Sequence, residues 1–368
     1  MEVKLLKELV SIESPTGSEG EISAFIQDLL VGEGIPVETL PVEGFGDDII
    51  ARLPGRGPTV VLNGHMDTVR ASEGWNRDPL GEFEGDRFYG LGSADMKGGL
   101  AAILGAFIEL SRFPLEKRPN VIFTAVSDEE GYSRGAWELI QSGKLEGTDL
   151  VLVAEPTGES LMLGARGRLV VMVRAIGKRA HAARPYLGVN AIEELGAFVG
   201  SLGRIRLRKH GQLGRGSYCT LHIGGSADGL SVPDEAMAII DRHIVPGEDW
   251  EKVRGELLAL WEKLGLRGNV EISRFERPTP EMLPYTVRRN SHFVNLFRSV
   301  HRALFGGDPE ITYGRSVGDF NYFGTYLGRP TLVYGPIGGN WHSADEWVSV
   351  SSVKRVKKFY LSYLRAMI

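Results

Sequence analysis

The sequence predicts an α/β protein in which a three-layer domain with a mixed sheet is interrupted by a smaller α+β sandwich. Three observations support this. Apolar runs early in the chain are continuous, which is typical of strands buried on both faces. The pattern changes after residues 164–167, and the first pattern returns from about Pro284. We therefore expect one domain in two parts, 1–166 and 283–368, with an inserted domain at 167–282.

The first part should begin with two helices. Leu5, Leu6, Leu9, Val10 and Ile12 share one helical face. Ser18 and Glu21 match a capping box ahead of the second helix. Buried strands are expected at 59–62, 121–126 and 150–153, and a helix of small apolar residues at 99–110. Such a helix can pack closely under a sheet, which predicts the three-layer arrangement.

The inserted part alternates shorter elements. Strands are expected at 169–176, 218–223 and 236–244, and helices at 190–202 and 249–264. This order predicts helices on one face of an antiparallel sheet. Beyond it we expect a helix at 291–304, a buried strand at 331–334 and a last helix from Val350.

Composition excludes several classes of protein. The formal charge of −5 argues against a nucleic-acid partner. The only cysteine, Cys219, rules out an internal disulfide and thiolate metal clusters. No stretch approaches the ~20 apolar residues of a membrane helix. The N-terminus is amphipathic and unlike a signal peptide. We expect a soluble, cytoplasmic protein with no membrane partner.

Five short segments carry metal-binding residues where a strand should stop. They centre on His65, Asp95, Glu129 with Glu130, Glu155, and His342. Two imidazoles and several carboxylates, with almost no cysteine, are the ligand set of a catalytic metal site. Loops after buried strands are also where α/β enzymes assemble their sites. The pattern predicts a metallohydrolase.

Each segment also has a simpler interpretation, which for His65 is a turn after a strand that carries an incidental histidine. His65 and Asp67 are two residues apart and point to the same side, so one can ligate while the other accepts the ring N–H. Asp95 follows a Gly-x-Gly turn, which suggests a dinucleotide loop or a helix cap. No strand immediately precedes that turn, however, and Asp replaces the third glycine. We favour a carboxylate bridging two metals about 3.5–4 Å apart.

The acidic pair Glu129 and Glu130 diverges in direction, so one can ligate while the other acts as general base. An acidic surface turn is the simpler explanation for this pair and for Glu155, and a satisfied polar residue is the simpler one for His342. The joint occurrence of all five segments in this order favours the metal site.

Together these segments resemble the M20 family of metallopeptidases and amidohydrolases, which includes aminoacylases, acetylornithine deacetylase, succinyl-diaminopimelate desuccinylase and glutamate carboxypeptidases. The resemblance implies a zinc-peptidase-type fold and two Zn²⁺ per chain, replaceable by Co²⁺ or Mn²⁺. It implies that His65, Asp95 and Glu155 hold one ion and that Asp95, Glu130 and His342 hold the other. Glu129 would be the general base and Asp67 the partner of His65. It also implies a cis peptide bond between Asp95 and Met96.

The resemblance further implies that the inserted domain is a lid that also forms a homodimer. His181, within residues 177–185, would stabilise the tetrahedral intermediate. The chain departs from the family further on: Ser231 stands where an Asn usually precedes a hydrophobic–Pro pair, and the usual Asp-x-Arg is Asp241-Arg242-His243. Arg242 and Arg315 are the candidates for binding the substrate carboxylate.

The implied reaction is hydrolysis of the amide bond of an N-acyl amino acid or a short peptide by metal-activated water. Deacetylase, desuccinylase and peptidase specificities all remain open. The alternative is a non-catalytic protein that kept the fold to bind a small molecule or peptide, but Glu129 and all five ligand positions are present, which argues against it. A serine hydrolase is disfavoured because no Gly-x-Ser-x-Gly segment occurs.

Overall fold

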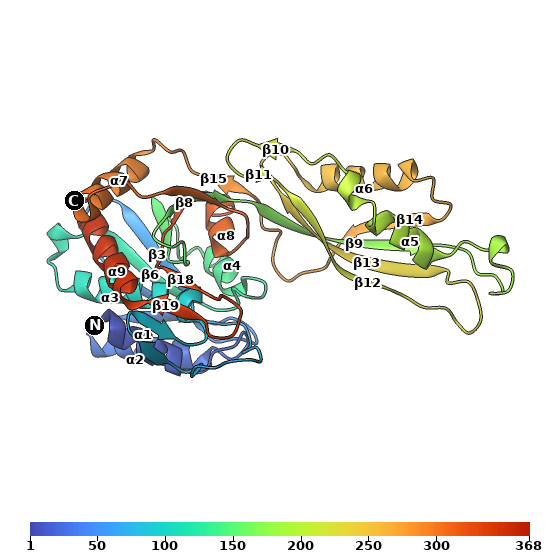
Figure 1. The fold of residues 1–368 in the computed structure, drawn as a ribbon. Helices are drawn as coiled ribbons and strands as arrows, with labels where there is room; N and C mark the ends of the chain where they lie inside the picture. Colours follow the sequence, from blue (N-terminus) through green and yellow to red (C-terminus); the bar gives the residue numbers. More distant parts are fainter. The chain divides into compact units, whose positions relative to one another are not determined.

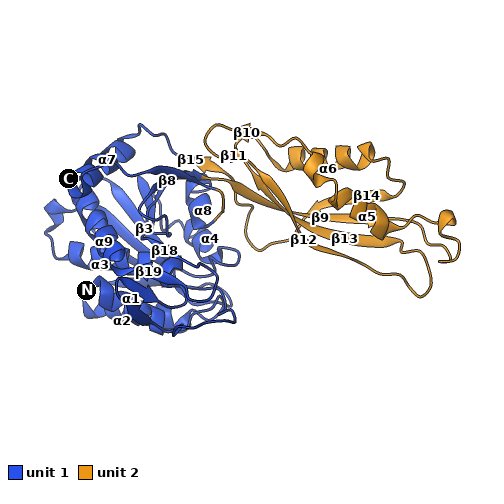
Figure 2. Ribbon diagram, in the orientation of Figure 1, with its two compact units in different colours: residues 1–164, 286–314, 318–368 blue, residues 165–285, 315–317 orange.

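The computed structural model describes all residues from 1 to 368, and the chain divides into two compact units (Figure 2). The first unit comprises Met1–Gly164, Thr286–Gly314 and Gly318–Ile368. The second comprises Ala165–Tyr285 and the short segment Arg315–Val317. The chain therefore leaves the first unit twice, and the second departure is only three residues long.

A mixed nine-stranded sheet forms the centre of the first unit, in the order β1-β2-β6-β3-β7-β17-β8-β15, with β16 also paired to β8. The strands β6, β3, β7 and β17 run parallel to one another, whereas β1, β2 and β8 join antiparallel. The strands are β1 Val37–Leu40, β2 Asp48–Leu53, β3 Thr59–His65, β6 Asn120–Val126, β7 Leu150–Val153, β8 Leu161–Ala165, β15 Tyr285–Thr286, β16 Ile311–Gly314 and β17 Thr331–Val333. The three early runs predicted as buried strands are confirmed as β3, β6 and β7, each almost entirely buried.

Helices cover both faces of this sheet, with α3 and α9 on one side and α4 and α8 on the other (Figure 1). The helices are α1 Glu2–Ser11, α2 Gly20–Gly32, α3 Gly98–Ser111, α4 Arg134–Gln141, α7 His292–Phe305, α8 Asp319–Thr325 and α9 Val350–Arg365. As predicted, α3 packs under the sheet: it contacts β3 and β6 and also α1 and α9, and nearly all its residues are buried. An apolar helix of this kind is stable only when it is enclosed on all sides.

The predicted capping box at Ser18 is wrong. Glu19 is the residue before α2, and no side chain caps the helix. The Glu19 carboxylate instead accepts hydrogen bonds from the backbone N–H groups of Gly17 and Gly46 at 2.9 and 3.1 Å. The helix therefore begins one residue later than the Ser-x-x-Glu pattern predicts, and the residue before it, Glu19, binds the loop and does not cap the helix.

A second, smaller antiparallel sheet of the first unit has the order β18-β19-β5-β4. Its strands are β4 Glu82–Glu84, β5 Arg87–Tyr89, β18 Gly338–Gly339 and β19 Trp347–Ser349. The loop from β5 to α3 contains a kinked turn, Ser93–Lys97, in which the peptide bond between Asp95 and Met96 is cis. That expectation is confirmed.

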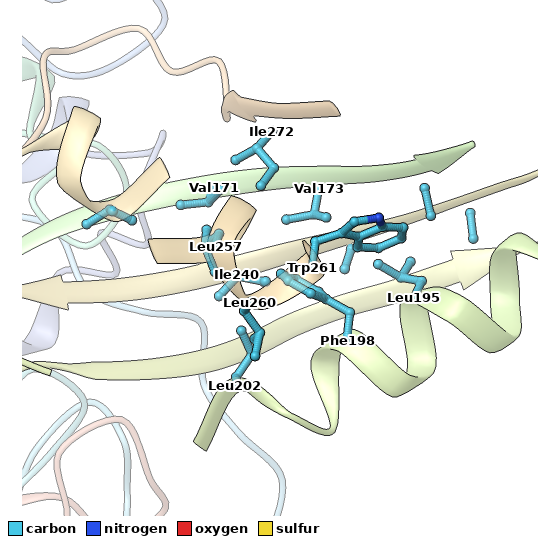
Figure 3. Packing of buried hydrophobic residues seen from close by; sticks show 14 of the residues in the cluster. Val171, Val173, Leu195, Phe198, Leu202, Ile240, Leu257, Leu260, Trp261 and Ile272 are labelled. Carbon is cyan, nitrogen blue, oxygen red and sulfur yellow. The ribbon is translucent and has the colours of Figure 1, made fainter. Parts of the chain in front are cut away.

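The second unit is an antiparallel sheet, in the order β12-β13-β9-β14, with two helices packed on it. Its elements are β9 Gly167–Ile176, α5 Ala191–Val199, β10 Lys209–His210, β11 Gly214–Arg215, β12 Ser217–Gly225, β13 Glu235–Ile244, α6 Trp250–Lys263 and β14 Asn269–Arg274. Alternate residues of β9 are buried, as expected for a sheet covered on one face. Figure 3 shows Phe198 of α5 and Trp261 of α6 packed over Val171, Val173 and Ile240 of the sheet.

Short single-turn helices occur at Leu115–Lys117, Pro185–Leu187 and Leu202–Arg204. None of the helices is both long and apolar enough to cross a lipid bilayer.

Candidate metal centre

The order of the central strands explains how the candidate ligands meet. Strands β6, β3 and β7 are parallel neighbours, so their carboxyl ends lie along one edge of the sheet. His65 is the last residue of β3, Glu129 and Glu130 follow β6, and Glu155 follows β7. Asp95 comes from the kinked turn before α3 and His342 from the loop between β18 and β19. All six residues belong to the first unit.

The Asp95 carboxylate lies between the two imidazoles. Its Oδ1 is 3.3 Å from Nε2 of His65, and its Oδ2 is 3.4 Å from Nε2 of His342. His65 Nε2 is also 3.9 Å from a carboxylate oxygen of Glu155, and His342 Nε2 is 3.0 Å from one of Glu130. One carboxylate with each oxygen facing a different imidazole is the arrangement that a bridge between two cations requires.

Glu129 lies at the same centre. Two sets of ligand atoms lie within 4.8 Å of one another: His65, Asp95 and Glu130, and His65, Glu129 and Glu155. Distance alone therefore admits Glu129 either as a ligand beside Glu155 or as a base next to the metal. The structure brings the predicted residues together, and both roles of Glu129, metal ligand and general base, are compatible with its position.

Asp67 has a different contact from the one expected. His65 Nδ1 is 2.9 Å from the backbone oxygen of Asp67 and 3.5 Å from its carboxylate. A carbonyl oxygen only accepts hydrogen bonds, so Nδ1 carries the proton and Nε2 is left for the metal side. The ring is oriented by the backbone of Asp67 and not primarily by its side chain.

The Asp67 carboxylate instead positions the acidic pair. It accepts hydrogen bonds from the backbone N–H groups of Glu129 and Glu130, both at 3.1 Å, and from the Thr16 hydroxyl at 2.9 Å. The preceding residue, Asp128, has a φ of 61°, a left-handed conformation that Asp tolerates better than most residues. Together these features fix the direction in which the two glutamates leave β6.

Glycines allow close approach around these ligands. A Cβ atom on Gly99 would lie 1.9 Å from the backbone oxygen of Ala154, and one on Gly335 would lie 2.1 Å from that of Glu155. A Cβ on Gly318 would lie 2.6 Å from Oε1 of Glu129. Helix α3, the end of β17 and the start of α8 can therefore contact the ligand loops only because these positions lack side chains.

The turn that carries Asp95 is held by Glu346, a buried residue for which the sequence analysis predicts no role. One Glu346 oxygen accepts the backbone N–H groups of Ala94 and Asp95, both at 2.9 Å, and the other accepts that of Gly92 at 2.8 Å. Three backbone donors on one carboxylate fix the start of the segment that presents the bridging aspartate.

Electrostatics favour a cation at this centre. Burial, followed by the neighbouring Glu155 carboxylate, raises the pKa of Glu129 well above its usual range. Burial and the Asp95 carboxylate do the same for the pKa of Glu155. Hydrogen bonds to Asp95 and Glu130 raise the pKa of His342 to about 10. Several carboxylates buried together are unfavourable unless positive charge compensates them. The donor set of three carboxylates and two imidazoles therefore fits divalent ions such as Zn²⁺.

A further carboxylate, Asp319, was missed in the sequence. It is 1% exposed at the start of α8, and burial raises its pKa to about 7. Its charge raises the pKa values of both Glu129 and Glu155. A Gly-Asp pair before a helix has the appearance of an ordinary cap, so the sequence alone offered no signal.

Three predicted residues belong to the second unit, and there one prediction fails. Arg242 is fully buried: its guanidinium is 2.6 Å from Glu248 and 3.7 Å from Glu256 and stacks over the Tyr218 ring. A substrate carboxylate cannot reach a guanidinium enclosed in this way, so Arg242 is a structural residue.

His181 and Arg315 remain exposed. The Ala183 N–H donates to Nδ1 of His181 at 3.1 Å, which places the proton of the neutral ring on Nε2. Arg315 has a second cation near it, Arg166, whose pKa is lowered by burial and then by the Arg315 charge. Arg166 was not singled out in the sequence.

Comparison with known proteins agrees with this fold. Of curated relatives, a probable succinyl-diaminopimelate desuccinylase of Staphylococcus aureus is 32% identical over 52% of this chain and 48% of its own length. The chain thus spans about half the length of that relative. A succinyl-diaminopimelate desuccinylase of a Methylobacterium species is 26% identical over 98% of this chain and 95% of its own.

Solved structures share the whole fold. A tripeptidase of Staphylococcus aureus superposes with a TM-score of 0.82 at 21% identity, covering 100% of this chain and 97% of its own. An M20 family metallo-carboxypeptidase of Sulfolobus solfataricus gives a TM-score of 0.79 at 18% identity, covering 100% and 99%.

The first unit is a mixed-sheet α/β unit with carboxylates and imidazoles gathered around the strand ends, and the inserted unit has two layers. This combination defines the class of protein, a metal-dependent hydrolase. The family model for peptidase family M20/M25/M40 matches residues 61–366. The chain belongs to that family.

Proposed function

We propose that the protein is a two-metal hydrolase that cleaves the amide bond of an N-acyl amino acid or a short peptide. The observation that carries the proposal is the Asp95 carboxylate, whose oxygens lie 3.3 and 3.4 Å from two different imidazoles. A single-metal site has no need of a carboxylate shared in this way.

The residues would hold two Zn²⁺ ions as follows: His65, Asp95 and Glu155 one ion, and Asp95, Glu130 and His342 the other, with Co²⁺ or Mn²⁺ as substitutes. When bound, such ions polarise the amide carbonyl and make water more acidic. The Asp67 carboxylate holds the backbone of Glu129 and Glu130, so both acidic side chains start from a fixed position.

Glu129 is the proposed general base. It would take a proton from the attacking water and deliver it to the leaving amine, a role that is typically worth about 10²–10⁴-fold in rate. Its burial supports this role, because a carboxylate with a raised pKa accepts a proton readily near neutral pH. His181, with its proton on Nε2, would donate to the developing oxyanion.

The substrate class rests on the names of the relatives. A desuccinylase, a tripeptidase and a carboxypeptidase all act on amides. Arg315, with Arg166 beside it, is the proposed binding site for a substrate carboxylate, since two guanidiniums can hold a carboxylate that one alone holds weakly.

Homodimerisation through the second unit is also proposed. Strand β12 is at the edge of its sheet, and Leu221 and Ile223 are 53% and 48% exposed there. An unprotected edge strand that carries apolar side chains is suited to pairing with a second copy. Sedimentation tests this proposal: the wild type should be a dimer, and Ile223→Lys should weaken it. A monomeric wild type would contradict the proposal.

The decisive experiment combines metal analysis with a substrate panel. Active protein should contain two divalent ions per chain and should release amine from N-acetyl amino acids, N-succinyl amino acids or di- and tripeptides. A chelator should abolish turnover, and Zn²⁺ or Co²⁺ should restore it. One ion per fully active chain would contradict the bridging role of Asp95. Metal binding without turnover of any amide would favour the binding-protein alternative.

A further inference from the structure

A cavity lies in the first unit and is lined by none of the proposed metal ligands. Its volume is about 230 Å³. The lining combines apolar side chains, two cations, one carboxylate and two hydroxyls: Val10, Ile12, Glu13, Ser14, Pro15, Thr68, Arg70, Ala71, Pro79, Leu80, Leu91 and Lys97. A cavity of about 150 Å³ already accommodates benzene, so this one has room for a ring or a branched chain with a polar group.

The inner end of the lining holds a buried lysine, whose pKa is lowered by burial to about 7. Lys97 is 1% exposed, and its Nζ donates one hydrogen bond, to the backbone oxygen of Ile12 at 2.7 Å. An ammonium carries three N–H donors, and no other acceptor contacts this one. A lysine enclosed with most of its donors unused is costly unless an acceptor is supplied.

A second polar group in the lining has no partner at all. Thr68 is 1% exposed, and its hydroxyl is buried without a hydrogen bond. Its backbone is fully engaged, because the N–H donates to Ser14 and the carbonyl accepts from Thr16. Its methyl group faces Gly92, where a Cβ would come within 2.4 Å. The Thr68 side chain therefore has little room to rotate, and a ligand atom could supply the hydrogen bond that its hydroxyl lacks.

The charges and the shape of the lining at the mouth restrict the chemical class of ligand further. Arg70 and Glu13 are both exposed there, so with Lys97 the lining contains two cations and one anion. The remaining wall, from Val10, Leu80 and Leu91, is apolar. An acceptor of negative charge fits the inner end, and an apolar body fits the wall.

We propose that this cavity binds a small monocarboxylate with a branched or aromatic body, its carboxylate accepting from Lys97 Nζ and the Thr68 hydroxyl. None of the residues that line this cavity is one of the proposed metal ligands. Its two polar anchors belong to the segments that carry Asp67 and Asp95, since Thr68 follows Asp67 and Lys97 is the last residue of the turn that contains Asp95.

Benzoate is the probe, with benzamide as its neutral counterpart of the same shape. Isothermal titration of metal-loaded protein at low salt should give one benzoate site with a dissociation constant of about 1 mM or tighter, a modest affinity suited to a ligand of this size. Benzamide should bind at least about tenfold more weakly, because it lacks the charge that pairs with an ammonium.

Variants locate the site without touching Lys97, which is too near Asp95 for a clean test. Thr68→Val keeps the side-chain shape and should weaken benzoate about tenfold, as expected for one hydrogen bond to a charged group. Ala71 is exposed at the mouth, so Ala71→Glu should weaken benzoate about threefold or more at low salt, and its size-matched control Ala71→Gln should stay within about twofold.

Three results would overturn the proposal. The first is the absence of benzoate binding at concentrations up to about 20-fold above the expected constant. The second is equal affinity in wild type, Thr68→Val and Ala71→Glu. The third is loss of benzoate binding on chelation with no response to either variant, which would place the carboxylate on the metal ions. None of these results depends on whether the protein hydrolyses amides.

Discussion

Glu346 offers the sharpest test of how the bridging aspartate is held. Its carboxylate accepts three backbone N–H groups, those of Gly92, Ala94 and Asp95, in a buried environment. Glu346→Gln keeps the size and shape of the side chain but leaves only one acceptor oxygen. If that oxygen takes the place of Oε1, the new amide NH₂ group faces the N–H of Gly92, and two donors then oppose each other.

The size of the effect follows from these contacts. At a pH above the pKa of Glu346, which burial raises to about 7, one hydrogen bond to a charged acceptor is lost, at about 1.5–3 kcal/mol. The other two now end on a neutral oxygen, which is roughly half as strong an acceptor. We expect the turn to be destabilised by about 2–4 kcal/mol, which corresponds to a factor of about 30–1,000 in its opening equilibrium.

Amide hydrogen exchange measures the opening equilibrium of the turn at the three amides that Glu346 binds. Exchange at Gly92, Ala94 and Asp95 should accelerate by the stated factor in Glu346→Gln, while exchange in the β3 and β6 strands stays unchanged. Metal affinity should fall with it, since the turn carries Asp95. Asp345→Asn is the matched control: Asp345 also accepts from three donors, of Asn76 and Arg77, but near the surface, where water can replace them. Exchange at the three amides within about threefold of wild type in Glu346→Gln would refute the reasoning.

The remaining predictions concern single side chains. Glu129→Gln should keep both metals and lose at least about 10²-fold in kcat with little change in KM, and loss of metal would instead make Glu129 a ligand, as its distance to His65 and Glu155 allows. His181→Ala should lower kcat by about 10²–10³ with metal content unchanged. If His181 acts in the active site of the other subunit, mixing this variant with Glu129→Gln should restore partial activity after subunit exchange. No recovery would exclude action across the dimer. In metal-free protein the raised pKa of Asp319, about 7 against 3.8, means that the folded state holds this proton more tightly. The unfolding free energy should therefore fall as pH rises from about 4 through 7, and less steeply in Asp319→Asn. Urea titrations at a series of pH values give the unfolding free energy, and an equal dependence on pH in the two proteins would contradict this assignment.

The sequence predicted those features that local pattern determines. The continuous apolar runs of β3, β6 and β7 identified strands buried on both faces, and their polar ends identified the candidate ligands. Nothing local could show that the three strands are parallel neighbours, which is the reason that His65, Glu130 and Glu155 meet.

Residues whose role depends on distant partners were misjudged or missed. Arg242 has the composition of a substrate ligand, but its pairing with Glu248 and its burial under Tyr218 appear only in the folded second unit. Glu346 lies about 250 residues after the turn that it holds. Asp319 looks like a helix cap until its proximity to Glu129 is seen. In each case the deciding contact is far away along the chain.

The position of β17 has a consequence for how the chain is made. This strand, Thr331–Val333, lies between β7 and β8 in the sheet, although both are synthesised well before it. At about 5–20 residues per second, a ribosome needs on the order of 10–40 s to reach β17 after finishing β7. During that interval β7 has an open edge, and the last candidate ligand, His342, does not yet exist. The strands of the second unit, from β9 to β14, pair only with one another and can assemble meanwhile. A nascent chain stalled before residue 331 should thus carry a folded insert on an unfinished host, open to chaperones and proteases at the edge of β7.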